Sequence, residues 1–198
     1  MAVTLRCVVR NSGEQLSAVS PDGSDAIDTI VDQWADQVPD LDVSAMQVLG
    51  RLHRSYLKYQ SALNVLFERQ GINTASFDVM AALRRSGPPY RMTAGQLSVA
   101  SMVTTGGITM RLDRLEKAGL VARERDASDR RIVHAQLTDK GFTLVEETAR
   151  AHFANEARML SQLNDAERSQ LAVLLRKLEH SIDENPVDDA SPALSPAH

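Results

Sequence analysis

The chain has 198 residues, of which 43% are hydrophobic and only 4% are aromatic. A chain of this length buries a hydrophobic core without needing disulfides, and its richness in Leu, Ala and Val favours helices over a β-sandwich. The net charge of −4 excludes a protein that coats nucleic acid without preference. Any binding of nucleic acid therefore requires a local basic surface.

The cysteine content and the hydropathy pattern exclude several further classes. Cys7 is the only cysteine, so there is no intramolecular disulfide and no cysteine-based zinc pattern, although a redox role for this thiol stays open. No apolar run approaches 18 residues, and the N-terminus lacks the apolar core of a signal peptide. We expect a cytoplasmic protein without membrane contact, metal or cofactor.

The first part of the chain predicts two helices after a flexible N-terminal segment, residues 1–23. A short helix follows Ser24 or Asp25 and ends before Pro39. Its four apolar positions share one face: Ile27, Ile30, Val31 and Trp34. A longer helix, capped by Asp42, runs to Gly71. Residues 24–71 thus form an extra N-terminal helix and a first dimerisation helix.

Residues 72–137 predict a helix-turn-helix followed by a β-hairpin. Thr74 caps a helix that closes at the Ser-Gly-Pro-Pro turn, residues 86–89, because proline cannot continue a helix. Thr93 opens a short helix, and Thr104 and Thr105 open the next one. Two strand-like runs, 120–125 and 132–137, flank a polar loop. Helix, helix and hairpin in this order make a winged DNA-binding domain.

Residues 138–184 predict two amphipathic helices that begin at Thr138 and Asn164, and residues 185–198 predict a disordered tail. These helices carry more Leu, Phe and Met than one small domain covers. We therefore expect a homodimer, with packing inside one monomer as the alternative. The predicted fold class is mainly α (α+β), a winged helix-turn-helix with long N- and C-terminal dimerisation helices.

The second helix of the predicted motif has two distinct faces. Ile108, Leu112 and Leu115 form an apolar stripe that faces the core. The helix N-terminus, the polar face and the wing supply the candidate DNA contacts: Thr104, Thr105, Gly106, Thr109, Met110, Arg114, Arg130 and Arg131. Thr and Arg read base edges in the major groove, and a wing Arg suits the minor groove.

Three separated motifs in residues 106–141 carry a resemblance to a known family. They are R-L-x-x-L-E-x-x-G-L-V-x-R, then D-x-x-D-R-R, then L-T-x-x-G. The chain resembles the MarR family of winged-helix repressors over about residues 43–183. The resemblance implies a dimer built by the long helices, bound to double-stranded DNA at a pseudo-palindromic operator.

A second set of residues indicates a ligand site. Asp78 and Arg85 are seven residues apart on one helix and share a face, whereas Arg84 is expected to point elsewhere. Arg111 flanks the apolar stripe, within reach of a carboxylate on a neighbouring helix. The set is similar to the urate-responsive subgroup of the MarR family. That resemblance implies Trp34, Arg85 and Arg111 as ligand contacts, Asp78 as the switch partner, and Arg123 near the same linkage.

The sequence therefore predicts a DNA-binding regulator, a repressor that a small anionic ligand such as urate or another organic acid releases from its operator. An enzyme is not expected, because no nucleophile elbow, phosphate loop or HExxH motif is present. The alternatives are a redox- or metal-responsive regulator and a winged-helix protein-interaction module that does not bind DNA.

Overall fold

The computed structural model describes residues 23–101, 105–126 and 128–186; for Thr105 and Gly106 it describes the backbone alone. The chain divides into two compact units between Glu68 and Arg69. The predicted flexible segment with Cys7, most of the predicted tail, and Thr104 lie outside the described residues. The elements are α1 (Ala26–Gln37), α2 (Met46–Arg69), α3 (Thr74–Arg85), β1 (Arg91–Thr93), α4 (Ala94–Ala100), α5 (Thr105–Lys117), β2 (Val121–Arg125), β3 (Val133–Leu137), α6 (Asp139–Met159) and α7 (Asp165–Glu184).

The first unit holds α1 and nearly all of α2. Asp25 caps α1, and its side chain accepts hydrogen bonds from the first turn of the helix. Arg51 of α2 reaches back to this cap and pairs with Asp25 at 3.1 Å and Asp28 at 2.8 Å. The missing side chain of Gly50 leaves room for buried Ile27, because a Cβ there would lie 2.9 Å from the Ile27 Cδ1. α1 is thus held on α2 by packing and charge together.

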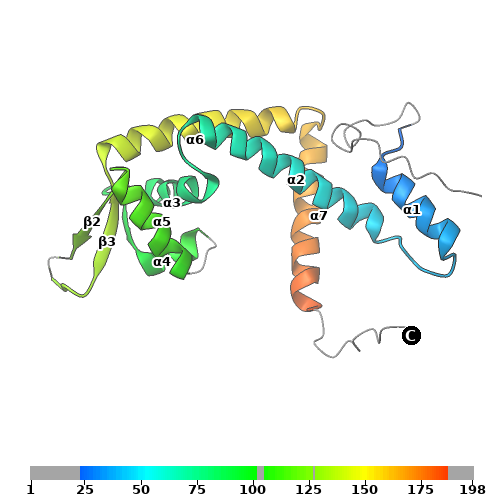
Figure 1. The fold of residues 1–198 in the computed structure, drawn as a ribbon, viewed down its shortest axis with the longest axis horizontal. Helices are drawn as coiled ribbons and strands as arrows, with labels where there is room; N and C mark the ends of the chain where they lie inside the picture. The colour runs from blue at the N-terminus through cyan, green and yellow to red at the C-terminus, as the bar shows by residue number, and fades with distance from the viewer. Residues whose placement is uncertain (1–22, 102–104, 127, 187–198) are drawn as a thin grey trace, which may run out of the picture. The chain divides into compact units, whose positions relative to one another are not determined.

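The second unit is built around three helices, α3, α4 and α5, that contact one another. Fully buried Leu83, Leu97 and Ile108 supply one apolar side chain from each helix to the common core. Thr93 caps α4, as the sequence predicts, whereas Asn73 and not Thr74 caps α3. Figure 1 shows α4 and α5 as consecutive helices beside the hairpin of β2 and β3. This is the helix-turn-helix with its wing.

A three-stranded antiparallel sheet in the order β1-β3-β2 supports the wing. The β2–β3 hairpin matches the predicted one, and β1 pairs with β3 so that Met92 faces Ala135. β1 was not predicted from the sequence. Three residues are too few to show an alternating pattern, and only the partner strand makes them a strand. The fold class is the predicted one, mainly helical with a small sheet.

The two C-terminal helices begin where the sequence predicts, with Thr138 as the cap of α6 and Asn164 as the cap of α7. The start of α6 packs against the turn between α5 and β2, which contains Gly119 at a φ of 68°. There the Lys140 ammonium donates to the Ala118 carbonyl at 2.9 Å. No described helix, these two long ones included, combines the length and the apolarity needed to cross a membrane.

Candidate nucleic-acid interface and ligand pocket

The recognition helix α5 presents one face to the core and the other to solvent. Ile108, Leu112 and Leu115 are buried, as the sequence predicts. Thr109, Arg114 and Met110 are exposed, and 62% of the surface of Met110 is open to solvent. The Thr105 side chain and the exposure of Gly106 lie outside what is described. The exposed face fits a helix that enters a groove of DNA.

The wing tip presents two arginines. Arg130 and Arg131 are exposed, and in the described part of the chain neither guanidinium forms an ion pair. The Arg131 backbone N–H donates to the Asp129 carboxylate at 2.9 Å, so that aspartate holds the main chain and not the arginine side chain. Both cations are therefore available to an anionic partner.

Arg123 connects the wing to the recognition helix. From β2 its guanidinium pairs with Asp113 at 2.6 Å and with Glu116 at 3.6 Å. It also donates to the Thr109 carbonyl at 3.3 Å. The place near the ligand linkage that the resemblance implies for Arg123 stays a prediction. These contacts tie the wing and α5 into one piece.

The Asp78 carboxyl lies within the electrostatic reach of Arg111 and Arg85. Burial raises the pKa of the half-buried Asp78 carboxyl above its ordinary value of 3.8, while the charges of Arg111, Arg85 and His152 pull the pKa down. Asp78 and Arg111 form no ion pair with each other in the described residues, and the buried Nη1 of Arg111 has no hydrogen-bond partner there. In this structure Asp78 and Arg111 therefore interact by charge at a distance, without the direct ion pair that was predicted.

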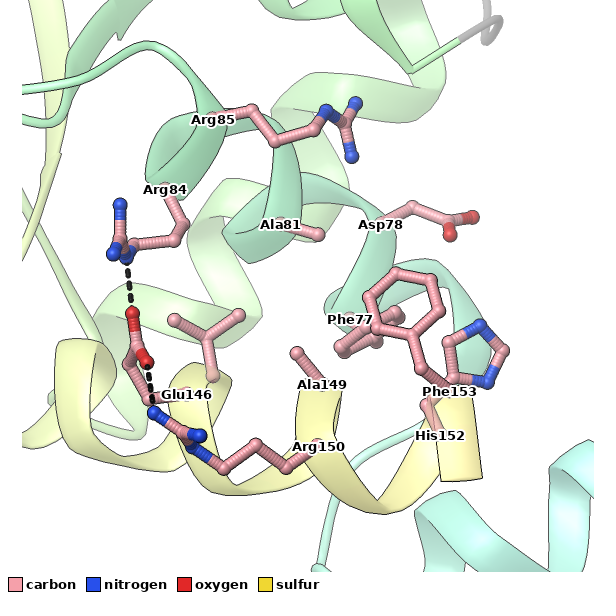
Figure 2. A pocket seen from close by; sticks show the side chains of 11 residues that line it. Phe77, Asp78, Ala81, Arg84, Arg85, Glu146, Ala149, Arg150, His152 and Phe153 are labelled. Carbon is pink, nitrogen blue, oxygen red and sulfur yellow. Dashed lines mark hydrogen bonds and ion pairs between the residues drawn. The ribbon is translucent and has the colours of Figure 1, made fainter. Parts of the chain in front are cut away.

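A cavity of about 530 Å³ lies between α3 and α6 and opens beside Asp78 and Arg85. Figure 2 shows the Asp78 carboxylate near the His152 and Phe153 rings, with Arg85 at the neighbouring rim. Volumes of roughly 300–1,000 Å³ are typical of small-molecule sites. Further lining side chains are Phe77, Ala81, Arg84, Val145, Glu146, Ala149 and Arg150.

The α6 wall of this pocket was not predicted. His152 was not singled out from the sequence. Arg84 was expected to point away from the face that Asp78 and Arg85 share, and Figure 2 shows it doing so. In the structure Arg84 lines the pocket and pairs with Glu146, which also contacts Arg150 at 3.6 Å. The buried His152 ring packs edge-on against Phe77 at a centroid distance of 5.2 Å.

A pattern on α6 could have indicated this wall. Val145, Ala149, His152 and Phe153 recur at helical spacing and share one face. The same pattern does not say which helix lies opposite.

Trp34, the remaining predicted ligand contact, belongs to the first unit. It is 45% exposed on α1, beside Gln33 and Gln37. Its part in ligand binding stays a prediction. The described residues contain no group of three His, Cys, Asp or Glu side chains placed to hold a metal ion.

The exposed recognition helix, the basic wing tip and the helix-turn-helix core define a winged-helix DNA-binding protein. A model of the MarR family matches residues 70–132. The chain is 39% identical over 159 residues to the HTH-type transcriptional regulator PecS of Dickeya dadantii, an alignment that spans 80% of this chain and 96% of that protein. The chain belongs to the MarR family, and it is a DNA-binding transcriptional regulator, not an enzyme.

Solved structures agree with this assignment. A mutant of E. coli MarR in complex with operator DNA superimposes with a TM-score of 0.60 at 28% identity, covering 70% of this chain and 99% of that one. Bordetella bronchiseptica BpsR, whose DNA binding is regulated by 6-hydroxynicotinic acid, gives a TM-score of 0.58 at 28% identity, covering 67% and 98%.

Proposed function

We propose that this protein is a homodimeric repressor that a small organic anion releases from a pseudo-palindromic operator. The observation that carries the proposal is the cavity beside Asp78 and Arg85, on a helix that packs against the recognition helix. BpsR, a relative of the same fold, responds to a heteroaromatic acid, and two further relatives, MdtR and MprA, are named repressors. Urate and 6-hydroxynicotinate are the first ligands to test.

Charge explains why the ligand should be an anion. Three arginines line the pocket, together with the apolar side chains of Phe77, Val145 and Phe153. A flat acid would stack on the rings and pair its carboxylate or enolate with the Arg85 guanidinium. Within the described residues this arginine donates to the Ala100 carbonyl, at 3.2 Å, so little is lost when it turns to a ligand.

The switch follows from Asp78. A bound anion brings negative charge next to a carboxylate that is already disfavoured by burial. The anion also competes with Asp78 for the positive charge of Arg111. The buried Nη1 of Arg111 has no hydrogen-bond partner among the described residues. The ligand thereby favours a different placement of α5, and a coupling of about 1–3 kcal/mol lowers DNA affinity 5–150-fold.

The dimer is supported by apolar side chains that α7 leaves exposed. In this helix no residue is buried, and five large apolar ones are open to solvent: Leu171, Val173, Leu174, Leu175 and Ile182. A single chain rarely exposes so many on one helix unless a partner covers them. A second copy of the chain is the partner that a two-fold operator requires.

The test is DNA release during titration with urate and 6-hydroxynicotinate, followed by anisotropy of a labelled duplex from the protein's own promoter region. Arg85→Ala should keep DNA affinity and lose the response. Arg158→Ala, which removes an arginine from the far end of α6 and outside the pocket, is the matched control. Release of DNA from Arg85→Ala at the wild-type ligand concentration would show that the pocket is wrongly placed.

Trp34 offers a separate readout, because it is the only tryptophan of the chain. Its emission should change during the same titration if it takes part in binding. An unchanged spectrum together with normal DNA release would remove Trp34 from the site and leave the pocket of the second unit in place.

A further inference from the structure

The loop of the wing is organised around one carboxylate, that of Asp126. Its Oδ1 accepts hydrogen bonds from the backbone N–H of Ser128 at 2.8 Å and of Asp129 at 3.2 Å, and from the Ser128 hydroxyl. Its Oδ2 lies 3.2 Å from the His134 Nε2 on β3. One side chain thus connects the start of the loop, its tip and the returning strand.

The main chain closes the same loop. The Asp126 N–H donates to the Ile132 carbonyl at 3.0 Å, and the Ile132 N–H donates to the Asp129 carbonyl at 2.9 Å. Arg130 and Arg131 lie inside this closed segment, and their side chains have no ion pair of their own in the described residues. The direction in which the two arginines leave the loop therefore depends on the contacts of Asp126.

We propose that Asp126 is a positioning residue for DNA binding, which sets the wing conformation that aims Arg130 and Arg131 at the duplex. The inference rests on the proposed role of the wing. The side chains of Asp126 and His134 are only 20% and 16% exposed, so the contact between them is sheltered from solvent. The hydrogen bonds from Ser128 and Asp129 hold the pKa of Asp126 well below its usual range, so it stays a carboxylate.

Electrostatics alone predicts the opposite effect of a substitution. Asp126 is a negative charge on a surface that approaches phosphates, so neutralising it should tighten DNA binding if charge were its only influence. A positioning role predicts weaker binding despite the more favourable charge. The sign of the change separates the two explanations.

The experiment compares Asp126→Asn with Glu124→Gln by anisotropy with the promoter duplex. Glu124 is an exposed acid two residues away on β2, and both substitutions remove one negative charge. We expect about a tenfold loss of affinity for Asp126→Asn, the scale of one lost DNA contact, and unchanged or tighter binding for Glu124→Gln. Equal affinities of the two variants would overturn the proposal.

A double-mutant cycle distinguishes positioning from general damage. In an Arg131→Ala background, Asp126→Asn should lose most of its effect, because the side chain that it aims is gone. Effects that add in full would overturn the positioning role. If Arg131→Ala and Arg130→Ala are both silent, the proposed role of the wing fails instead.

Ser128→Ala provides a milder variant if Asp126→Asn disturbs folding. It removes one donor to Asp126 and leaves the net charge and both strands unchanged. We expect a two- to threefold loss of affinity, about the effect of one ordinary hydrogen bond of 0.5 kcal/mol, that disappears in the Arg131→Ala background. A loss that persists there, or no loss at all, would count against the proposal.

Discussion

At the scale of single residues, the wing arginines give a direct test of DNA contact. Arg131 is exposed at the tip, and a guanidinium of this kind suits the negative potential of a minor groove. Arg131→Ala should weaken binding by about 1–3 kcal/mol and reduce the dependence of affinity on salt. Titrations at several salt concentrations measure both effects. Affinity that is unchanged in both Arg130→Ala and Arg131→Ala at moderate salt would remove the wing from the interface.

Asp78 makes a prediction about stability and pH. The pKa of Asp78 is raised in the folded protein, so the native state binds the Asp78 proton more tightly than the unfolded state does. Ionisation of Asp78 therefore lowers the free energy of unfolding as the pH rises through the folded pKa. Asp78→Asn keeps the shape and removes this cost. Its melting temperature should exceed that of the wild type near pH 7, and the difference should vanish as the pH falls below the ordinary 3.8. A variant that is less stable at pH 7 would mean that the attraction of Arg111 and Arg85 outweighs burial.

Residue roles could be predicted where a helix pattern fixes which way a side chain faces. The buried and exposed faces of α5 follow from its spacing alone, which is why Ile108 and Thr109 fall where expected. The partners of Arg123 and Arg84 could not be predicted, because Asp113 and Glu146 come from other elements whose approach is a property of the fold. The face of a helix on which a side chain lies follows from the local sequence, whereas its ion-pair partner depends on how the elements pack.

At the scale of elements, capping chemistry located most of the helices. Asp25, Thr93, Thr138 and Asn164 all accept hydrogen bonds from the first turns that they precede. Asp42 instead accepts from the Ser44 N–H, and α2 begins later, at Met46. An Asx turn and a helix cap use the same acceptor, so sequence alone does not separate them.

The packing of α6 against the wing domain gives the next prediction. A Cβ at buried Gly141 would lie 1.9 Å from the Leu120 carbonyl oxygen, which is main chain and has little freedom to move. Gly141→Ala should therefore cost about 1–3 kcal/mol or more of the free energy of unfolding. Urea denaturation monitored by circular dichroism measures this cost.

Gly95 of α4 is the matched control for that substitution. An added Cβ there meets nothing closer than the Thr93 Oγ1 at 4.0 Å. Because alanine favours helix over glycine by up to about 1 kcal/mol, Gly95→Ala should be neutral or stabilising. Equal destabilisation by both substitutions would indicate that the close contact at Gly141 is not the cause.

At the scale of the whole molecule, the helix-turn-helix, the wing and the proposed ligand pocket all belong to the second unit, while both long helices α2 and α7 carry exposed apolar side chains. Leu52 and Tyr56 of α2 and Leu174 and Ile182 of α7 are all more than a third exposed. Burying such side chains contributes about 25 cal/mol per Å², so several of them on each protomer stabilise an association substantially. The sequence could predict this excess of apolar side chains but not the geometry of their partner, which we propose is a second copy of the chain.

Removing α7 tests this arrangement. A chain ending at residue 160 keeps α6 and the winged domain and loses every exposed apolar residue of α7, so it should be monomeric by sedimentation velocity at micromolar concentration. It should also lose tight DNA binding, because one half-site supplies few contacts and the second half-site is then no longer linked to the first. A chain ending at residue 186 removes only residues beyond α7 and should behave as the full-length protein does. A dimeric chain ending at 160 would place the interface elsewhere, on α2 or α6, whereas a monomeric one with undiminished affinity would contradict the two-fold mode of operator binding.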